Sequence, residues 1–352
     1  MAILKTQNVK ISALCCALPG DERDVYQVGR GFFEDETIRK TTEPIGVEKL
    51  YFADEGQTAS DLCFFAAKHL IEKTAIAAEE IDGLIFATQT PDYPAPATSC
   101  ILQDRLGLTS DCFTMDINAG CSAFVDAYFI AANMIQGGAC RKILILIGDT
   151  LRRNISPGDK GLTFIISDAA SAVLVERTGE TIPSTTIVKT RGSGFESLII
   201  PAGGSREPVS DETGEMQVDG DGSKRSLEDM YMNGMDVFTF AVKEVPVIIK
   251  EVAELHEIDV DDIDYFLLHQ ANAYMLKFIA KRAKIPMEKM PVNISKYGNT
   301  NGSTIPFLIC DLAGSELSSP RDVIFSGFGI GLSWGAAVTR LGGFSSADII
   351  RV

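Results

Sequence analysis

The sequence predicts an α/β protein made of two similar halves, and three observations support this. Strand-like and helix-like segments alternate along the chain, which is typical of sheets with helices packed on their faces. The chain has 352 residues and is 45% hydrophobic, a size that exceeds one simple core. Several segments of the first half also have counterparts, in the same order, in the second half.

The first half begins with a strand and continues with alternating elements. Residues 1–20 lack a cationic region followed by an uninterrupted apolar core, so we interpret them as a strand rather than a signal peptide. Helical periodicity predicts helices at 59–75 and 125–138, the second ended by a glycine pair. Short apolar runs predict buried strands at 81–89, 141–149 and 169–177.

The second half repeats three patterns of the first. The first pattern is an amphipathic helix, a short acidic link and the dipeptide Ile-Asp, followed by an apolar strand. The second is an apolar helix that ends in Asp-x-x-Gly, and the third is an apolar strand near the end of each half. The pairs are 66–89 with 247–270, 91–107 with 298–314, and 170–177 with 335–341. We therefore expect halves at 1–180 and 181–352, with a polar, glycine-rich loop at 203–229 that is either functional or disordered.

Charge and cysteine content exclude several functional classes. The formal net charge of −16 argues against nucleic-acid binding, since phosphate neutralisation needs a cationic surface. No apolar run approaches the length of a membrane span. The eight cysteines are scattered without a CxxC pair, and only three histidines are present. We therefore expect no metal site and a reduced, cytoplasmic protein.

Cys121 lies in "DINAGCSAF" (116–124), immediately before an apolar run. Free cysteines are among the most buried residues, so packing explains Cys121 as well as chemistry does. If the residue lies at a helix N-terminus, the helix dipole and free N–H groups should lower the pKa of its thiol and make it nucleophilic. The segment alone leaves both interpretations open.

Three further segments carry candidate residues. His269 closes the strand-like "YFLLH" (265–269), and ligands bind at the carboxyl ends of strands in open α/β sheets. Asn299 lies in a Gly/Asn-rich turn, which turn chemistry alone would also explain. The glycines of "FSGFGIGLSWGAA" (325–337) have the wrong spacing for a dinucleotide loop. Their density favours a close approach of backbone amides to a reacting centre.

Taken together, four motifs resemble one family. "DINAGCSAF", "LLHQANAYM", "YGNTNGSTIP" and "GFGIGLSWGAA" occur in this order, and the set resembles β-ketoacyl-acyl-carrier-protein synthase III of the thiolase superfamily. The resemblance implies a thiolase-like five-layer αβαβα fold and a catalytic triad of Cys121, His269 and Asn299. It also implies an oxyanion hole made by the backbone N–H groups of Cys121 and Ile330, and no metal or redox cofactor.

The resemblance further implies a two-step reaction. An acyl group passes from acyl-coenzyme A or an acyl carrier protein to Cys121, and a malonyl thioester on acyl carrier protein then condenses with it. His269 and Asn299 are expected to donate hydrogen bonds to the malonyl thioester carbonyl. Acyl carrier protein is the implied partner. Cations on the segment 274–289 would steer this acidic partner, with Lys277, Lys281 and Arg282 as docking residues.

Several departures from the family pattern concern the primer. Glu48 and Tyr274 stand where the family has arginine, and Lys160 stands where an arginine often stacks on the nucleotide, with Phe33 as the aromatic on its other side. Each lost charge-assisted contact weakens coenzyme A binding by about 1.5–3 kcal/mol. We therefore expect a carrier-bound or unusual primer in a specialised lipid, polyketide or glycoconjugate pathway. Tyr93 lies where the family places an aromatic residue in the partner subunit's acyl pocket, which implies a homodimer.

Other activities of the superfamily are weighed against this one. A non-condensing acyltransferase that passes the acyl group from Cys121 to an alcohol or amine uses the same triad. A hydroxymethylglutaryl-type synthase would need a glutamate base, and none is present in 91–99. A degradative thiolase would carry a second cysteine in 325–337, and a non-catalytic partner typically lacks the nucleophile. The acyltransferase is therefore the main alternative.

Overall fold

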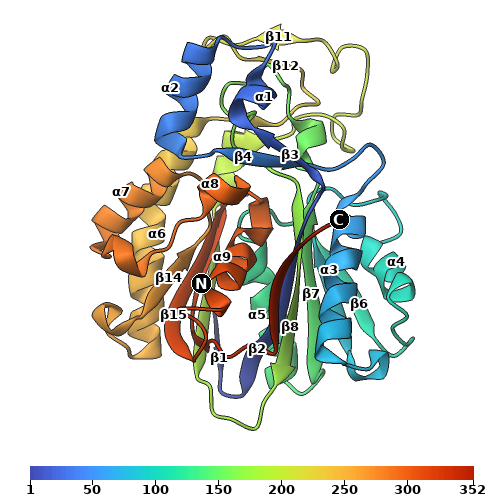
Figure 1. The fold of residues 1–352 in the computed structure, drawn as a ribbon, viewed down its shortest axis with the longest axis vertical. Helices are drawn as coiled ribbons and strands as arrows, with labels where there is room; N and C mark the ends of the chain where they lie inside the picture. The colour runs from blue at the N-terminus through green and yellow to red at the C-terminus, as the bar shows by residue number, and fades with distance from the viewer.

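Two mixed β-sheets form the framework of the protein, whose computed structural model describes residues 1–352 (Figure 1). The first sheet has the strand order β17-β2-β8-β7-β5-β6. The bounds of these strands are Ser346–Arg351, Val9–Leu18, Ala169–Arg177, Lys142–Asp149, Gly83–Ala87 and Phe113–Ile117. Strand β5 runs parallel to β6 and β7, whereas β8 runs antiparallel to β7 and β2.

The second sheet repeats this pattern. Its order is β1-β9-β16-β15-β14, with the bounds Ala2–Thr6, Ser184–Thr190, Ser333–Leu341, Arg321–Gly329 and Tyr265–Leu268. Strands β14 and β15 are parallel, as β5 and β7 are, and the remaining pairs are antiparallel. The strands β9, β16, β15 and β14 therefore correspond to β2, β8, β7 and β5.

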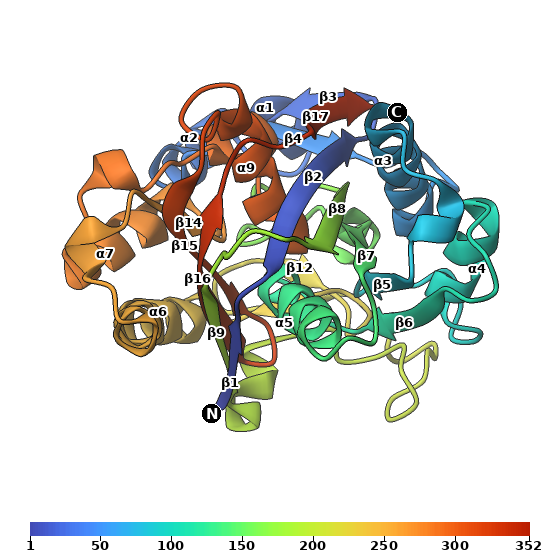
Figure 2. The same cartoon turned by 90° about the horizontal axis from the view of Figure 1, so that it is seen from below.

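Five layers are stacked, as the family resemblance implied (Figure 2). Helices α5 (Ala123–Gln136) and α9 (Thr304–Ala313) lie between the sheets. Helices α3 (Ala59–Thr74) and α4 (Thr98–Arg105) cover the outer face of the first sheet. The outer face of the second sheet is covered by α6 (Gly234–His256) and α7 (Ala273–Ala283). The central helices contact a sheet on both sides, which explains why their sequences are apolar nearly all round.

The two chain ends exchange sheets. Residues 1–20, expected to form one strand, form β1 in the second sheet and β2 in the first, because the chain crosses between the sheets at Gln7 and Asn8. The C-terminal strand β17 pairs in parallel with β2 of the first sheet. The other strands and helices expected in the first half are confirmed, with ends that shift by a few residues.

One of the three repeat pairs is wrong as a structural correspondence. The match of 91–107 with 298–314 equates α4 with α9, but α4 lies on the outer face of the first sheet whereas α9 lies between the sheets. Helix α9 precedes β15 just as α5 precedes β7, so α5 is its counterpart. The shared Asp-x-x-Gly ending reflects a common way to end a helix.

A cap of small elements covers one end of the sheets (Figure 1). It contains α1 (Val25–Gly29), α2 (Asp35–Ile45), and the paired strands β3 (Asp21–Asp24) and β4 (Lys49–Phe52). The loop expected at 203–229 also lies here and contains the paired strands β11 (Gln217–Val218) and β12 (Lys224–Arg225). Arg225 forms an ion pair with Asp159, and Lys224 N–H donates to the Gly158 carbonyl at 3.1 Å. These contacts hold the loop against the body of the protein.

Three short elements complete the fold. Strands β10 (Leu198–Ile199) and β13 (Tyr231–Met232) pair with each other on either side of the long loop. Helix α8 (Ile294–Tyr297) precedes the turn that leads into α9. None of the helices combines the length and the hydropathy that a bilayer span requires.

Candidate active site

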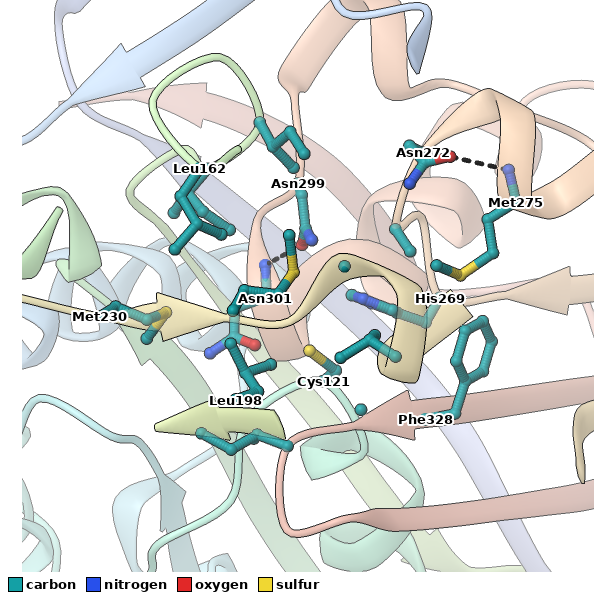
Figure 3. Close-up of a pocket in the computed structure, with 18 of the residues that line it drawn as sticks. Cys121, Leu162, Leu198, Met230, His269, Asn272, Met275, Asn299, Asn301 and Phe328 are labelled. Carbon is teal, nitrogen blue, oxygen red and sulfur yellow. Dashed lines mark hydrogen bonds between the residues drawn. The ribbon is translucent and has the colours of Figure 1, made fainter. Parts of the chain in front are cut away.

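A largely apolar cavity between the two halves contains Cys121, His269 and Asn299 (Figure 3). Its empty volume is about 840 Å³, including the part open to solvent, and 14 of its 21 lining residues are hydrophobic. Three of these are methionines, Met230, Met232 and Met275. The structure therefore brings together three residues that lie far apart in the sequence and that the family resemblance had singled out.

Cys121 occupies the turn between β6 and α5 and is partly exposed. Ser122 is the N-cap of α5, so Cys121 lies just before the helix rather than in its first turn. The backbone N–H groups of Ile330 and of Cys121 itself act to lower the pKa of the thiol. Burial outweighs them and raises the pKa of the thiol to about 11. The expected lowering of this pKa is therefore wrong, because the apolar cavity withholds solvation from the thiolate.

The glycine-rich segment passes directly against Cys121. A Cβ atom at Gly329 would lie 2.7 Å from both Cβ and Sγ of Cys121, and one at Gly327 would lie 2.9 Å from the Cys121 carbonyl oxygen. Any side chain at these positions would displace the cysteine. The glycine-rich backbone therefore approaches Cys121 closely, which explains why these positions are glycine.

His269 follows β14 directly and is 1% exposed. Its backbone N–H donates to the Ser326 carbonyl at 2.9 Å. Its Nδ1 lies 2.8 Å from Oγ1 of Thr304, whose hydroxyl also reaches the Asn301 carbonyl oxygen at 3.1 Å. Burial lowers the pKa of the imidazole to about 3. The ring is therefore neutral at physiological pH.

Asn299 lies in the turn that precedes α9 and is nearly buried. Its backbone N–H donates to the Ile165 carbonyl at 2.8 Å, and its carbonyl accepts from Ser167 N–H at 3.0 Å. The side-chain Oδ1 accepts a hydrogen bond from Asn301 N–H at 2.9 Å. Its Nδ2 has no partner within the protein, so this donor is available to a ligand in the cavity.

Sequence reasoning missed a polar group behind these residues. Asp149 accepts hydrogen bonds from Asn301 Nδ2 at 2.7 Å and from Gln89 N–H at 2.7 Å, and Gln89 and Asn301 also line the cavity. Burial raises the pKa of Asp149 to about 7. Gln89 and Asp149 close the strand-like runs 81–89 and 141–149. The strand-end rule that singled out His269 would have found them too.

The expected docking cations lie on the exposed side of α7. Lys277, Lys281 and Arg282 are exposed and form no ion pair or hydrogen bond. Tyr274 is 47% exposed and its ring lies 4.7 Å from that of Phe278 and 5.6 Å from that of Phe238, measured between centroids. Phe238 also lines the cavity. An aromatic group beside free cations therefore stands next to the cavity.

The remaining predicted residues lie outside the cavity lining. Lys160 Nζ donates to the Asp221 carbonyl of the 203–229 loop at 2.8 Å, and the Phe33 ring packs 5.4 Å from that of Phe164. Tyr93 is 58% exposed in the segment between β5 and α4. No group of three or more histidine, cysteine or carboxylate side chains is arranged to hold a metal ion.

Two family models match parts of this chain, and sequence relatives match most of its length. The model of 3-oxoacyl-[acyl-carrier-protein (ACP)] synthase III matches residues 115–192, and the model of its C-terminal part matches residues 253–341. A β-ketoacyl-[acyl-carrier-protein] synthase III of Clostridium perfringens is 35% identical over 309 residues, which cover 87% of this chain and 91% of the relative. One from Koribacter versatilis is 33% identical over 338 residues, which cover 95% and 98%.

A solved structure of the same family has the same fold as this chain. The 3-oxoacyl-(acyl-carrier protein) synthase of Burkholderia xenovorans LB400 superposes with a TM-score of 0.93 and 34% identity, covering 100% of this chain and 99% of the other. The fold, the element order and the sequence therefore agree over the full length of the chain. The chain belongs to the 3-oxoacyl-[acyl-carrier-protein] synthase III family of acyl-transferring condensing enzymes.

Proposed function

We propose that this enzyme acylates Cys121 and then condenses the acyl group with a malonyl thioester carried by acyl carrier protein. One observation carries the proposal: Cys121 and Ile330 line an apolar cavity that also holds His269 and the free Nδ2 of Asn299. A nucleophile, an oxyanion-binding N–H group and two neutral polar groups are what a condensation requires.

In the first step, the Cys121 sulfur attacks the carbonyl carbon of the acyl thioester. A carbon–sulfur bond to Cys121 forms, the donor's carbon–sulfur bond breaks, and the thiol proton leaves with the departing thiolate. The N–H groups of Cys121 and Ile330 bind the negative oxygen of the intermediate. Because burial raises the pKa of Cys121 and lowers that of His269, the resting pair is neutral rather than a thiolate–imidazolium pair.

In the second step, the malonyl thioester loses carbon dioxide. The bond to the carboxylate breaks and its electron pair forms an enolate, whose oxygen accepts hydrogen bonds from Asn299 Nδ2 and from the His269 ring. The enolate carbon then attacks the acyl carbonyl on Cys121. A carbon–carbon bond forms, the Cys121 carbon–sulfur bond breaks, and the sulfur takes up a proton. Two neutral donors stabilise the enolate without protonating it outright.

The acyl donor is proposed to be carrier-bound rather than coenzyme A. Lys160 is hydrogen-bonded to the 203–229 loop, Phe33 packs against Phe164, and Tyr274 supplies an aromatic ring where a cation would hold a phosphate. The contacts expected for a nucleotide are therefore used within the protein or missing. A carrier-bound primer is consistent with a specialised lipid, polyketide or glycoconjugate pathway.

The carrier is proposed to dock on α7. Lys277, Lys281 and Arg282 are free cations in a protein with a net charge of −16, and they lie on α7, the helix whose Met275 lines the cavity. An acidic carrier would be steered to this surface and away from the rest of the molecule. The Tyr274 and Phe278 rings offer apolar contact at the same place.

The enzyme is proposed to be a homodimer. Strand β6 is an unpaired edge of the first sheet, and Phe113 at its start is 47% exposed. An open edge with an exposed aromatic residue is a template for pairing with another strand. A second copy of the chain is the proposed occupant, and Tyr93 would then reach the partner's cavity.

Mass spectrometry after exposure to a panel of acyl carriers and acyl-coenzyme A thioesters tests the first step. We expect an acyl adduct on the Cys121 peptide that is absent in Cys121→Ala. Addition of malonyl-acyl carrier protein should then release carbon dioxide and a β-keto product. Turnover without decarboxylation would indicate transfer to an alcohol or amine, and no adduct with any primer would contradict covalent catalysis.

A further inference from the structure

The turn that carries Asn299 is tied to the first half of the molecule by one side chain. Asn301 lies two residues beyond Asn299, and its Nδ2 donates to Asp149 Oδ2 at 2.7 Å and to Gln89 Oε1 at 3.0 Å. Asp149 ends β7, and Gln89 follows β5 of the same sheet. All three residues are at least partly buried, so water does not replace these hydrogen bonds readily.

The backbone of Asn301 reaches both proposed donors. Its N–H donates to Asn299 Oδ1 at 2.9 Å, which turns Nδ2 of Asn299 away and toward the cavity (Figure 3). Its carbonyl oxygen lies 3.1 Å from the Thr304 hydroxyl, which contacts Nδ1 of His269 at 2.8 Å. The position of one peptide segment therefore determines how both donors are presented.

This backbone adopts an unfavourable conformation that the side chain holds in place. Asn301 has a φ of 52°, in the left-handed region that residues other than glycine rarely occupy. Asparagine tolerates this region better than most residues. Such a conformation persists where surrounding contacts determine it, and the contacts to Asp149 and Gln89 do so here.

We infer that Asn301 is a positioning residue: its anchor on Asp149 and Gln89 aligns the Asn299 amide, and through Thr304 the His269 ring, for decarboxylation. The inference rests on the proposed function of these two donors. Cys121 belongs to a different turn and is aligned by the glycine segment. Loss of the anchor should therefore impair decarboxylation selectively and leave acylation of Cys121 largely intact.

The test variant is Asn301→Gly, which removes the anchoring side chain but keeps the N–H group and accepts a positive φ. We expect kcat for carbon dioxide release from malonyl-acyl carrier protein to fall about 100-fold, with KM nearly unchanged and Cys121 acylation within a few-fold of wild type. Adding Asp149→Asn to the Asn301→Gly variant should lower the decarboxylation rate little further, because both changes break the same contact.

Asn293→Gly is the matched control. Asn293 is also a buried asparagine that donates to an aspartate, Asp311, at 3.0 Å, but it does not line the cavity. Asn293→Gly should lower the melting temperature about as much as Asn301→Gly does. It should leave the rates of decarboxylation and of Cys121 acylation both close to wild type. If Asn301→Gly decarboxylates at the wild-type rate, or loses acylation and decarboxylation in equal proportion, the inference is overturned.

A crystal structure of Asn301→Gly gives a readout that does not depend on turnover. We expect the Asn299 side chain to rotate or to leave the position that faces the cavity. An unmoved Asn299 would contradict the inference even if the wild-type enzyme proved inactive on every thioester. An inactive wild type would instead contradict the proposed function.

Discussion

Helices α5 and α9 occupy equivalent places in the two halves, yet the turns that precede them are built differently. The turn before α5 presents Cys121 and is packed against the backbone of Gly327 and Gly329. The turn before α9 presents Asn299 and is held by side-chain hydrogen bonds. The first allows the backbone to approach the sulfur closely, whereas the second fixes the direction of an amide.

This difference suits the separate tasks that the proposed reaction gives to the two halves. A nucleophile needs room for a tetrahedral carbon and N–H groups close to the developing oxyanion, which favours residues without side chains. A hydrogen-bond donor to an enolate needs a fixed orientation, which favours buried polar partners. In the proposed reaction, the fused halves therefore supply two kinds of chemistry from two versions of one turn.

The largest expected effect separates the two turns. His269→Ala and Asn299→Ala should each lower decarboxylation of malonyl-acyl carrier protein by about 100- to 1,000-fold, because each removes a donor to the enolate. Acylation of Cys121 should fall by much less. Carbon dioxide release and the acyl adduct measure the two steps separately, and equal losses in both would erase the distinction between the turns.

The glycine side of the comparison is tested by Gly329→Ala. The new Cβ would lie 2.7 Å from Cβ and Sγ of Cys121, so the sulfur must move. We expect Cys121 acylation to fall about 100-fold. Gly314→Ala is the control, because Gly314 has a negative φ and no atom within 4 Å of an added Cβ. A Gly329→Ala enzyme that acylates normally would show that this close approach is not needed.

The environment of the sulfur can be measured by alkylation. Because burial raises the pKa of Cys121 to about 11, the reactive thiolate is scarce at neutral pH and increases as the pH rises. The rate of iodoacetamide labelling of the Cys121 peptide should rise about tenfold per pH unit from pH 7 to 10. A rate that is already at its plateau at pH 7 would show that the helix N-terminus, not burial, governs this thiol.

The smallest effect concerns docking on α7. Lys281→Glu should raise KM for malonyl-acyl carrier protein by about three- to tenfold at low ionic strength, with kcat nearly unchanged, and high salt should remove most of the difference. Lys68→Glu is the control, since Lys68 is also exposed but lies on α3, which covers the other sheet. Equal effects of the two changes would indicate a general charge effect rather than a docking site.

Much of this architecture follows from local patterns. Apolar runs predicted β5, β7 and β8, and periodicity with a glycine stop predicted α3 and α5, because these signals depend on neighbouring residues. The one repeat pair that was wrong, 91–107 with 298–314, rested on a shared Asp-x-x-Gly helix ending. Such an ending does not indicate which face of a sheet the helix covers. The position at the end of a strand pointed to His269, and Asp149 occupies the same kind of position at the end of β7.

The sequence by itself determined the fold class, the main strands and helices of the first half, and three residues that meet in the cavity: Cys121, His269 and Asn299. The tertiary structure alone decided that β1 and β17 exchange sheets, that burial controls the pKa of Cys121, and that Asn301 is anchored to the first half. The physical reason is distance along the chain. Asn301 and Asp149 are separated by 152 residues, and neither desolvation nor a hydrogen bond between them exists until folding brings the two halves together.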